Sequence, residues 1–155
     1  PDTHLLLIGD GPMRDELDAQ IAALGLTDHF HFAGLVPPAQ VHRYLAQADL
    51  LWHLSLREGL PRSVVQALAT GIPAIGYRLD GTPEVIRDGE TGYCVAPQQV
   101  GEVIEATRKI WNDPALARQM GETGRKRVIE QFDWPRMADI LEREYRELLA
   151  HKTRS

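Results

Sequence analysis

The sequence predicts an α/β fold built on a parallel sheet, and three observations support this prediction. Short continuous apolar runs alternate with amphipathic helical stretches, the order typical of βαβ units. Gly, Pro or Asp residues bound the apolar runs, as expected of strands buried on both faces. Beyond residue 95 the pattern is entirely helical. We therefore expect a Rossmann-like, doubly wound sheet with helices on both faces and a helical C-terminal tail.

Each apolar run is short enough to be a strand and is followed by a helical stretch. The predicted strands are His4–Ile8, His29–Ala33, Asp49–Leu54, Ile72–Tyr77 and Tyr93–Val95. The predicted helices between them are Met13–Leu24, Pro38–Ala48, Pro61–Thr70 and the shorter Pro83–Arg87. Right-handed crossovers put every strand-to-helix loop at one edge of such a sheet, where these folds bind ligands.

Three further helices are predicted after the last strand, at Val100–Trp111, Leu116–Glu130 and Arg136–Ala150. The sequences Asp113-Pro114 and Asp133-Trp134-Pro135 are typical helix starts, with an Asp cap and Pro in the first turn. An apolar stripe runs along one side of the last helix and consists of Met137, Ile140, Leu141, Tyr145 and Leu148. The other side of this helix is charged, as on an ordinary solvated surface.

Length and composition describe an ordinary globular protein. A chain of 155 residues suits one domain, so residues 1–155 are expected to fold as a single unit. The net charge of −5 argues against a nucleic-acid partner but does not exclude a small anionic ligand. The single cysteine, Cys94, excludes an internal disulfide and favours a cytoplasmic location. Its apolar neighbours indicate a buried thiol.

The stretch from Glu58 to Gln66 has the features of a ligand-binding corner. Pro61 suits a first helical turn, which would leave the N–H groups of Arg62, Ser63 and Val64 free to bind an anion such as a diphosphate. Gly59 lets a ligand approach the backbone, and the polar side chains at either end could bind hydroxyl groups. An alternative is that Glu58 only favours the helix electrostatically and Gln66 is an ordinary polar position. The residues alone leave both interpretations open.

Other motifs are less specific. The turn Gly9-Asp10-Gly11-Pro12 lacks both the third Gly of a dinucleotide fingerprint and the Lys of a P-loop, which disfavours a dehydrogenase. His29 and His31 share a strand face but have no third metal ligand nearby in the sequence, so no metal site is predicted. His53 ends a predicted strand at the ligand edge and is a further candidate for substrate contact.

Two runs together carry a resemblance to a known family. They are S-x-x-EGLP-x-x-x-x-QALA-x-G-x-P from Ser55 and DGTPEVI-x-DG-x-x-G from Asp80, and LLLIGDGPMRDEL, ADLLWHLS and FDW occur in the matching order. This pattern resembles the donor-side signature of the family 4 retaining glycosyltransferases, which have the GT-B fold. Such enzymes consist of two Rossmann-like halves, and the chain resembles the C-terminal, donor-binding half over nearly its whole length.

The resemblance implies roles for individual residues. Glu58 would contact the transferred sugar as the candidate catalytic residue, and the backbone of Gly59, Leu60 and Pro61 would line the sugar and phosphate site. Gln66 would bind the ribose. Val36, in the segment Gly34-Leu35-Val36, would lie beside the nucleotide base. The donor would be a nucleotide diphosphate sugar, and the family uses neither a metal nor another cofactor.

The chain departs from the family in three respects. Gln66 stands where the family usually has a second Glu, and Asp80-Gly81 stands where it has Gly-Gly. A first strand and helix with an Arg and a Lys for the donor phosphates is missing, together with the acceptor-binding half. The resemblance therefore implies a fragment without transferase activity of its own, whose membrane association, if any, would come through the missing half.

The stripe on the last helix would lose its cover without the other half, so we expect self-association or a frayed C-terminus. Two other functions remain open at this point. One is a nucleotide-sugar epimerase of the same architecture, and the other is a non-catalytic nucleotide-binding or assembly module.

Overall fold

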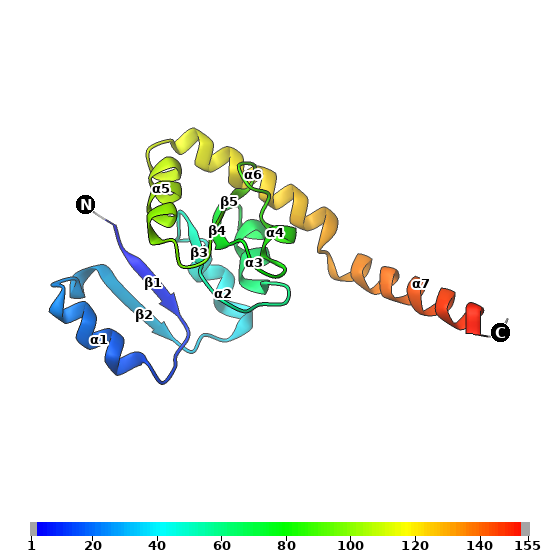
Figure 1. Cartoon of the computed structure of the whole chain (residues 1–155), viewed down its shortest axis with the longest axis horizontal. Helices are drawn as coiled ribbons and strands as arrows, with labels where there is room; N and C mark the ends of the chain where they lie inside the picture. Colours follow the sequence, from blue (N-terminus) through cyan, green and yellow to red (C-terminus); the bar gives the residue numbers. More distant parts are fainter. Residues whose placement is uncertain (1–2, 153–155) are drawn as a thin grey trace. The chain divides into compact units, whose positions relative to one another are not determined.

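The computed structural model describes residues 3–152, with side chains to residue 150, and the chain divides into two compact units (Figure 1). Pro1–Tyr44 form the first unit and Leu45–Ser155 the second. The single domain expected over residues 1–155 stays a prediction.

The first unit contains a two-stranded parallel sheet. Strand β1 (Leu5–Ile8) pairs with β2 (Phe30–Gly34), with Leu5 opposite Phe30. Helix α1 (Arg14–Ala23) connects them and is followed by a short 3-10 helix, η1 (Thr27–His29). The sequence analysis assigned His29 to the strand, but its N–H donates to the Leu26 carbonyl at 2.9 Å and closes a turn. Helix α2 (Pro38–Leu45) ends at the boundary between the units.

The second unit contains a three-stranded parallel sheet in the order β3–β4–β5. The strands are β3 (Leu51–His53), β4 (Ala74–Tyr77) and β5 (Gly92–Val95). The helices of this unit are α3 (Arg62–Thr70), α4 (Thr82–Val85), α5 (Val100–Trp111), α6 (Pro114–Gln131) and α7 (Trp134–Lys152). Every strand and helix predicted from the sequence is present, with bounds that differ by at most three residues.

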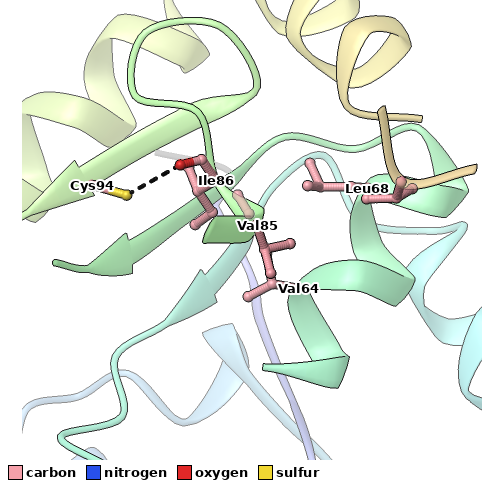
Figure 2. Packing of buried hydrophobic residues seen from close by; sticks show 7 residues of the cluster. Val64, Leu68, Val85, Ile86 and Cys94 are labelled. Carbon is pink, nitrogen blue, oxygen red and sulfur yellow. Dashed lines mark hydrogen bonds between the residues drawn. The ribbon is translucent and has the colours of Figure 1, made fainter. Parts of the chain in front are cut away.

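Both faces of the three-stranded sheet are covered by helices. On one face Val64 and Leu68 of α3 pack with Val85, Ile86 and Cys94, which Figure 2 shows from close by. On the other face Ile75, Tyr77 and Val95 pack with Val103, Ala106 and Ile110 of α5 and with Met120 of α6. Alternate residues of β4 belong to the two clusters, as the pleat of a strand requires. The predicted α/β class with helices on both faces is confirmed.

Helix α6 packs closely on α3 because two glycines of α6 let the two helices approach each other. A Cβ built on Gly121 would lie 1.9 Å from the carbonyl oxygen of Gly71, and one built on Gly124 would lie 2.6 Å from Leu68 Cδ2. The start of α6 is also well defined. The side chain of Asp113 accepts the N–H of Leu116 at 3.0 Å, which confirms the predicted cap.

Helix α7 has no buried residue among those described. The predicted stripe is exposed along its length, from Met137 at 37% to Tyr145 and Leu148 at 65%. The helical C-terminal tail is therefore confirmed, and its apolar side is open. None of the helices in the described part of the chain combines the length and apolarity needed to cross a membrane.

Candidate functional site

The candidate site lies in the second unit, where β3 and β4 end side by side. These strands are parallel, with His53 opposite Gly76, so the loops that follow them leave the same edge of the sheet. The loop after β3 carries Glu58 and Gly59 and leads into α3, while the loop after β4 carries Asp80 and Gly81 and leads into α4. The carboxyl edge of a parallel sheet is where such folds bind ligands.

Two hydrogen bonds join these loops. The backbone N–H of Glu58 donates to Asp80 Oδ2 at 3.0 Å, and the N–H of Gly81 donates to the carbonyl of Gly59 at 3.0 Å. A Cβ on Gly81 would lie only 2.1 Å from the Gly59 oxygen, so the two backbones touch. Asp80 has a φ of 48°, a left-handed conformation that Asp tolerates better than most residues. The segment around Glu58 is thus fixed by its neighbour.

Pro61 precedes α3 rather than occupying its first turn. It is buried and extended, with φ −73° and ψ 94°. The N–H of Val64 donates to the Pro61 carbonyl at 3.0 Å, so the prediction that this N–H is free is wrong. The N–H groups of Arg62 and Ser63 donate to no acceptor among the described residues. Two unpaired donors at the positive end of a helix can bind an anion.

Glu58 faces a histidine that is itself bonded to a serine. Glu58 Oε1 lies 3.8 Å from His53 Nε2, and Ser63 Oγ lies 3.1 Å from His53 Nδ1. The Glu58 side chain is 39% exposed, whereas that of His53 is only 11% exposed. Burial lowers the pKa of His53 below its usual value, and the Glu58 carboxylate opposes this shift.

The remaining predicted residues of this unit flank the same corner. Gly59 is exposed, and a Cβ built on it would meet nothing within 4 Å, so space is open at this point of the backbone. Leu60 packs against the core cluster of α3. Gln66 is half-buried about one turn into α3. The structure therefore brings the loop residues and the start of α3 together.

Val36 lies in the first unit, in the loop between β2 and α2, and is half-buried there. Gly34, which ends β2, has a φ of 64°, so the chain turns sharply into this loop. The predicted contact of Val36 with a nucleotide base stays a prediction.

The structure adds detail to the residues considered for metal or thiol chemistry. His4 Nδ1 lies 2.9 Å from His31 Nε2, and His29 Nδ1 lies 2.9 Å from the Thr3 carbonyl oxygen. No group of three or more His, Cys, Asp or Glu residues suited to a metal ion occurs within the described residues. Cys94 is buried, and burial raises its pKa to about 11, so its thiol is unreactive.

Two surface hollows are lined by residues other than those of the corner. One of about 470 Å³ belongs to the first unit and is lined by residues that include Arg14, Asp18 and Phe32. The other, of about 320 Å³, lies beside β5 and α5 and is lined by residues that include Asp88 and Lys109. Neither contains a predicted donor-binding residue. The candidate site is instead an open edge of the sheet, identified by the unpaired N–H donors of Arg62 and Ser63 and by the loop that carries Glu58, whose backbone N–H is bonded to Asp80.

Parallel sheets with helices on both faces and an open helix start at the strand ends define a Rossmann-like α/β protein. The sequence matches the family described as Glycosyl transferases group 1 over residues 1–127, and the chain therefore belongs to this family. Its fold is that of the C-terminal half of a GT-B glycosyltransferase.

Individual relatives agree with this assignment. The N-acetyl-alpha-D-glucosaminyl L-malate synthase of Bacillus anthracis is 34% identical over 148 residues, which are 96% of this chain and 38% of that protein. Sucrose-phosphate synthase from Thermosynechococcus elongatus superposes with a TM-score of 0.87 and 29% identity, over 96% of this chain and 39% of that one. The chain thus spans less than half the length of these relatives.

A third comparison concerns a protein solved with a ligand. Anabaena HepE in complex with UDP-glucose has a TM-score of 0.83 and 23% identity, over 97% of this chain and 42% of that one. At this identity the likeness concerns the fold alone.

Sequence reasoning missed two parts of the site. It did not pair Asp80 with Glu58, which are 22 residues apart, and it did not join Ser63 to His53. The first could have been anticipated, because Asp80 replaces the Gly that the resembling family has there. The second depends on the rotation of α3 about its axis, which no local pattern determines.

Proposed function

We propose that the chain is the donor-binding domain of a retaining glycosyltransferase. The whole protein would transfer a hexose from a nucleotide diphosphate sugar to an acceptor hydroxyl, and the anomeric configuration would be kept. The observation that carries this proposal is the corner formed by Glu58, Gly59 and the start of α3. It combines a carboxylate on a loop whose backbone is bonded to Asp80, an open backbone and two unpaired N–H donors within one short segment.

Each part of a nucleotide sugar has a matching group in this corner. The diphosphate would accept hydrogen bonds from the N–H groups of Arg62 and Ser63, which the dipole of α3 makes electropositive. The sugar would pass beside Gly59, where no side chain intervenes, and its hydroxyls would donate to Glu58. Gln66 would bind the ribose, and its amide keeps an acceptor and donors without the charge of a carboxylate.

The chemistry asked of this chain is electrostatic. In the transfer the bond between the anomeric carbon and the diphosphate oxygen breaks, and a bond to the acceptor oxygen forms on the same face. The proton of the acceptor hydroxyl passes to the departing diphosphate. Negative charge grows on the departing diphosphate, and donors already aimed at it stabilise that charge without reorganisation. No metal held by this chain and no further cofactor takes part in this account.

The partners in this proposal are the nucleotide-sugar donor and a separate acceptor-binding half of the whole protein. We propose a cytoplasmic location, where nucleotide sugars would be available to the open corner, and no nucleic-acid partner. Membrane association would come only through the other half. The purified chain by itself would transfer no sugar.

The proposal is tested by calorimetric titration of the chain with UDP-glucose, GDP-mannose, UDP and GDP. We expect saturable binding of at least one nucleotide sugar. Gly59→Ala leaves the fold intact, because a Cβ there meets nothing within 4 Å, and should weaken binding by about tenfold, or ~1.4 kcal/mol, because the methyl group occupies ligand space. Gly101→Ala, in α5, has equally open surroundings and serves as the matched control.

The outcomes distinguish the proposal from other functions. Absence of saturable binding with all four ligands would indicate a non-catalytic module and contradict the proposal. Conversion of the sugar nucleotide by the whole protein without any acceptor would indicate an epimerase instead. Glycosyl transfer by the purified chain alone would contradict the expectation that this domain needs its other half.

A further inference from the structure

We propose that His53 is a positioning residue that orients the Glu58 carboxylate, and that the Ser63 hydroxyl fixes the ring form in which it does so. The inference rests on the proposed function, because it assigns Glu58 to the sugar. It starts from three side chains in which the imidazole of His53 lies between the other two. Ser63 Oγ lies 3.1 Å from His53 Nδ1, and His53 Nε2 lies 3.8 Å from Glu58 Oε1.

The three residues come from elements whose positions are fixed independently. His53 is the last residue of β3, opposite Gly76 of β4. Ser63 lies in the first turn of α3, whose Val64 and Leu68 are fully buried. Glu58 lies in the loop between these elements, and its backbone N–H is bonded to Asp80. The imidazole therefore bridges the rigid start of the helix and the loop.

Electrostatics selects one of the two neutral ring forms. If Nδ1 carries the proton and donates to Ser63, the lone pair on Nε2 faces the Glu58 carboxylate, and two acceptors repel each other. If Ser63 donates its hydroxyl proton to Nδ1, the proton on Nε2 points toward Glu58 Oε1, and the contact is attractive. The second arrangement also uses the donor of the serine. We therefore infer that the ring is protonated on Nε2.

The Nε2 atom is buried and has no hydrogen-bond partner among the residues that the structure describes. A buried donor without an acceptor is unfavourable, because it has lost its hydrogen bonds to water. The neighbouring carboxylate oxygen is only 3.8 Å away, so a small rotation of the Glu58 side chain would satisfy the donor. This gives the carboxylate one favoured position in its otherwise half-open surroundings.

The burial of His53 argues against direct contact of its ring with a ligand. The His53 side chain is 11% exposed and its Nε2 is shielded from solvent, whereas the Glu58 side chain is 39% exposed. A sugar in the corner can reach the carboxylate without reaching the ring. Burial lowers the pKa of His53, which favours the neutral ring, and a neutral Nε2–H suffices for this contact. His53 therefore acts through Glu58.

Two kinds of substitution separate positioning from packing. His53→Leu keeps a side chain of similar bulk and removes both ring nitrogens. His53→Gln restores an N–H donor near the position of Nε2, and Ser63→Ala removes the hydroxyl that selects the ring form. Each variant is titrated with UDP-glucose and UDP, and with GDP-mannose and GDP.

The readout is the ratio of the affinity for the nucleotide sugar to that for its nucleoside diphosphate. Because Glu58 is assigned to the sugar, His53→Leu should lower this ratio by about threefold to tenfold, or ~0.7–1.4 kcal/mol, and leave diphosphate binding within about twofold. His53→Gln should retain most of the ratio. An equal loss of affinity for both ligands in His53→Leu would show a merely structural role and overturn the inference.

A second measurement needs no ligand and separates this inference from the proposed function. Nitrogen-15 NMR of the His53 ring reports which nitrogen carries the proton. We expect the proton on Nε2 in the native chain, a change in this preference in Ser63→Ala, and a shift of the Nε2 resonance in Glu58→Gln. If these NMR results are obtained but no ligand binds in the titrations, the inference stands and only the proposed function is refuted. A ring protonated on Nδ1 would overturn the inference whatever binds.

Discussion

Asp80 accepts the backbone N–H of Glu58 at 3.0 Å and thereby joins the loops that follow β3 and β4. The bond holds the segment that carries the candidate carboxylate, although Asp80 itself is 22 residues away. It also explains the left-handed backbone at Asp80, since this conformation accompanies a side chain that reaches across to the other loop. Asp80 stands where the resembling family has Gly. It therefore has a structural role, because its side chain accepts the backbone N–H of Glu58.

The first prediction concerns this bond. Asp80→Ala should destabilise the fold by about 1–3 kcal/mol, because it removes an acceptor and places an alanine at a positive φ. Asp80→Asn keeps an acceptor and tolerates the backbone, so it should stay close to the native protein. Asp80→Gly removes only the acceptor, so its stability should lie between those of the Ala and Asn variants. Urea unfolding measures all three, and equal stability of the Ala and Asn variants would contradict the role of the bond.

The second prediction concerns the contact between α3 and α6. Gly121→Ala should destabilise the fold by about 1–3 kcal/mol or more, although alanine favours helices, because its Cβ would lie 1.9 Å from a backbone oxygen. Gly101→Ala in α5 meets no atom within 4 Å and should be neutral or stabilising by up to about 1 kcal/mol. Thermal unfolding compares the pair. A stable Gly121→Ala variant would show that the helices pack less closely than described.

The third prediction concerns pH. The pKa of His53 is lowered in the folded chain, mainly by burial, so below about pH 6.5 the unfolded chain binds the additional proton. The free energy of unfolding should therefore fall as the pH drops from the ordinary histidine pKa through the lowered folded value. The difference between the native chain and His53→Gln isolates this contribution from that of the other histidines. Parallel stability curves for the two chains between pH 7.5 and 5 would contradict a lowered pKa.

The fourth prediction concerns the apolar side of α7, where Tyr145 and Leu148 are each 65% exposed. We expect the chain to self-associate as its concentration rises, or its last helix to fray, because an apolar stripe of this length favours burial. Leu141→Glu together with Leu148→Glu should abolish the association and leave the fold of the sheet unchanged. Analytical ultracentrifugation measures the mass. A monodisperse monomer whose last helix is as protected from hydrogen exchange as the sheet would contradict this prediction.

The sequence predicted the elements of the fold because each has a strong local pattern. The apolar runs of β4 and β5, the Asp113 cap and the alternation of strands with helices could all be read locally. It predicted three free N–H groups at the start of α3, and one of them is bonded. Pro61 precedes the helix, and its carbonyl accepts the N–H of Val64. Whether Pro61 lies just before or just inside a helix depends on the loop that packs beside it.

The residues of the candidate site could be selected from the sequence, but the contacts between them could not. Glu58, Gly59 and Gln66 could be selected from their spacing around a helix start. The contacts of Glu58 with Asp80 and His53 arise from the register of β3 with β4 and from side-chain directions, which are set by tertiary packing. Such contacts decide whether a carboxylate is fixed or mobile, so they bear directly on the proposed role of Glu58.

The central claim is that the start of α3 and the adjoining loop hold a nucleotide sugar. Nitrogen-15 NMR titration of the whole chain with UDP-glucose and GDP-mannose tests it most directly, because it reports each backbone N–H and detects even weak binding. We predict that the largest saturable shifts occur at Gly59, Arg62 and Ser63, and that they shrink in Gly59→Ala. Saturable shifts centred elsewhere, or none with either nucleotide sugar, would contradict the account.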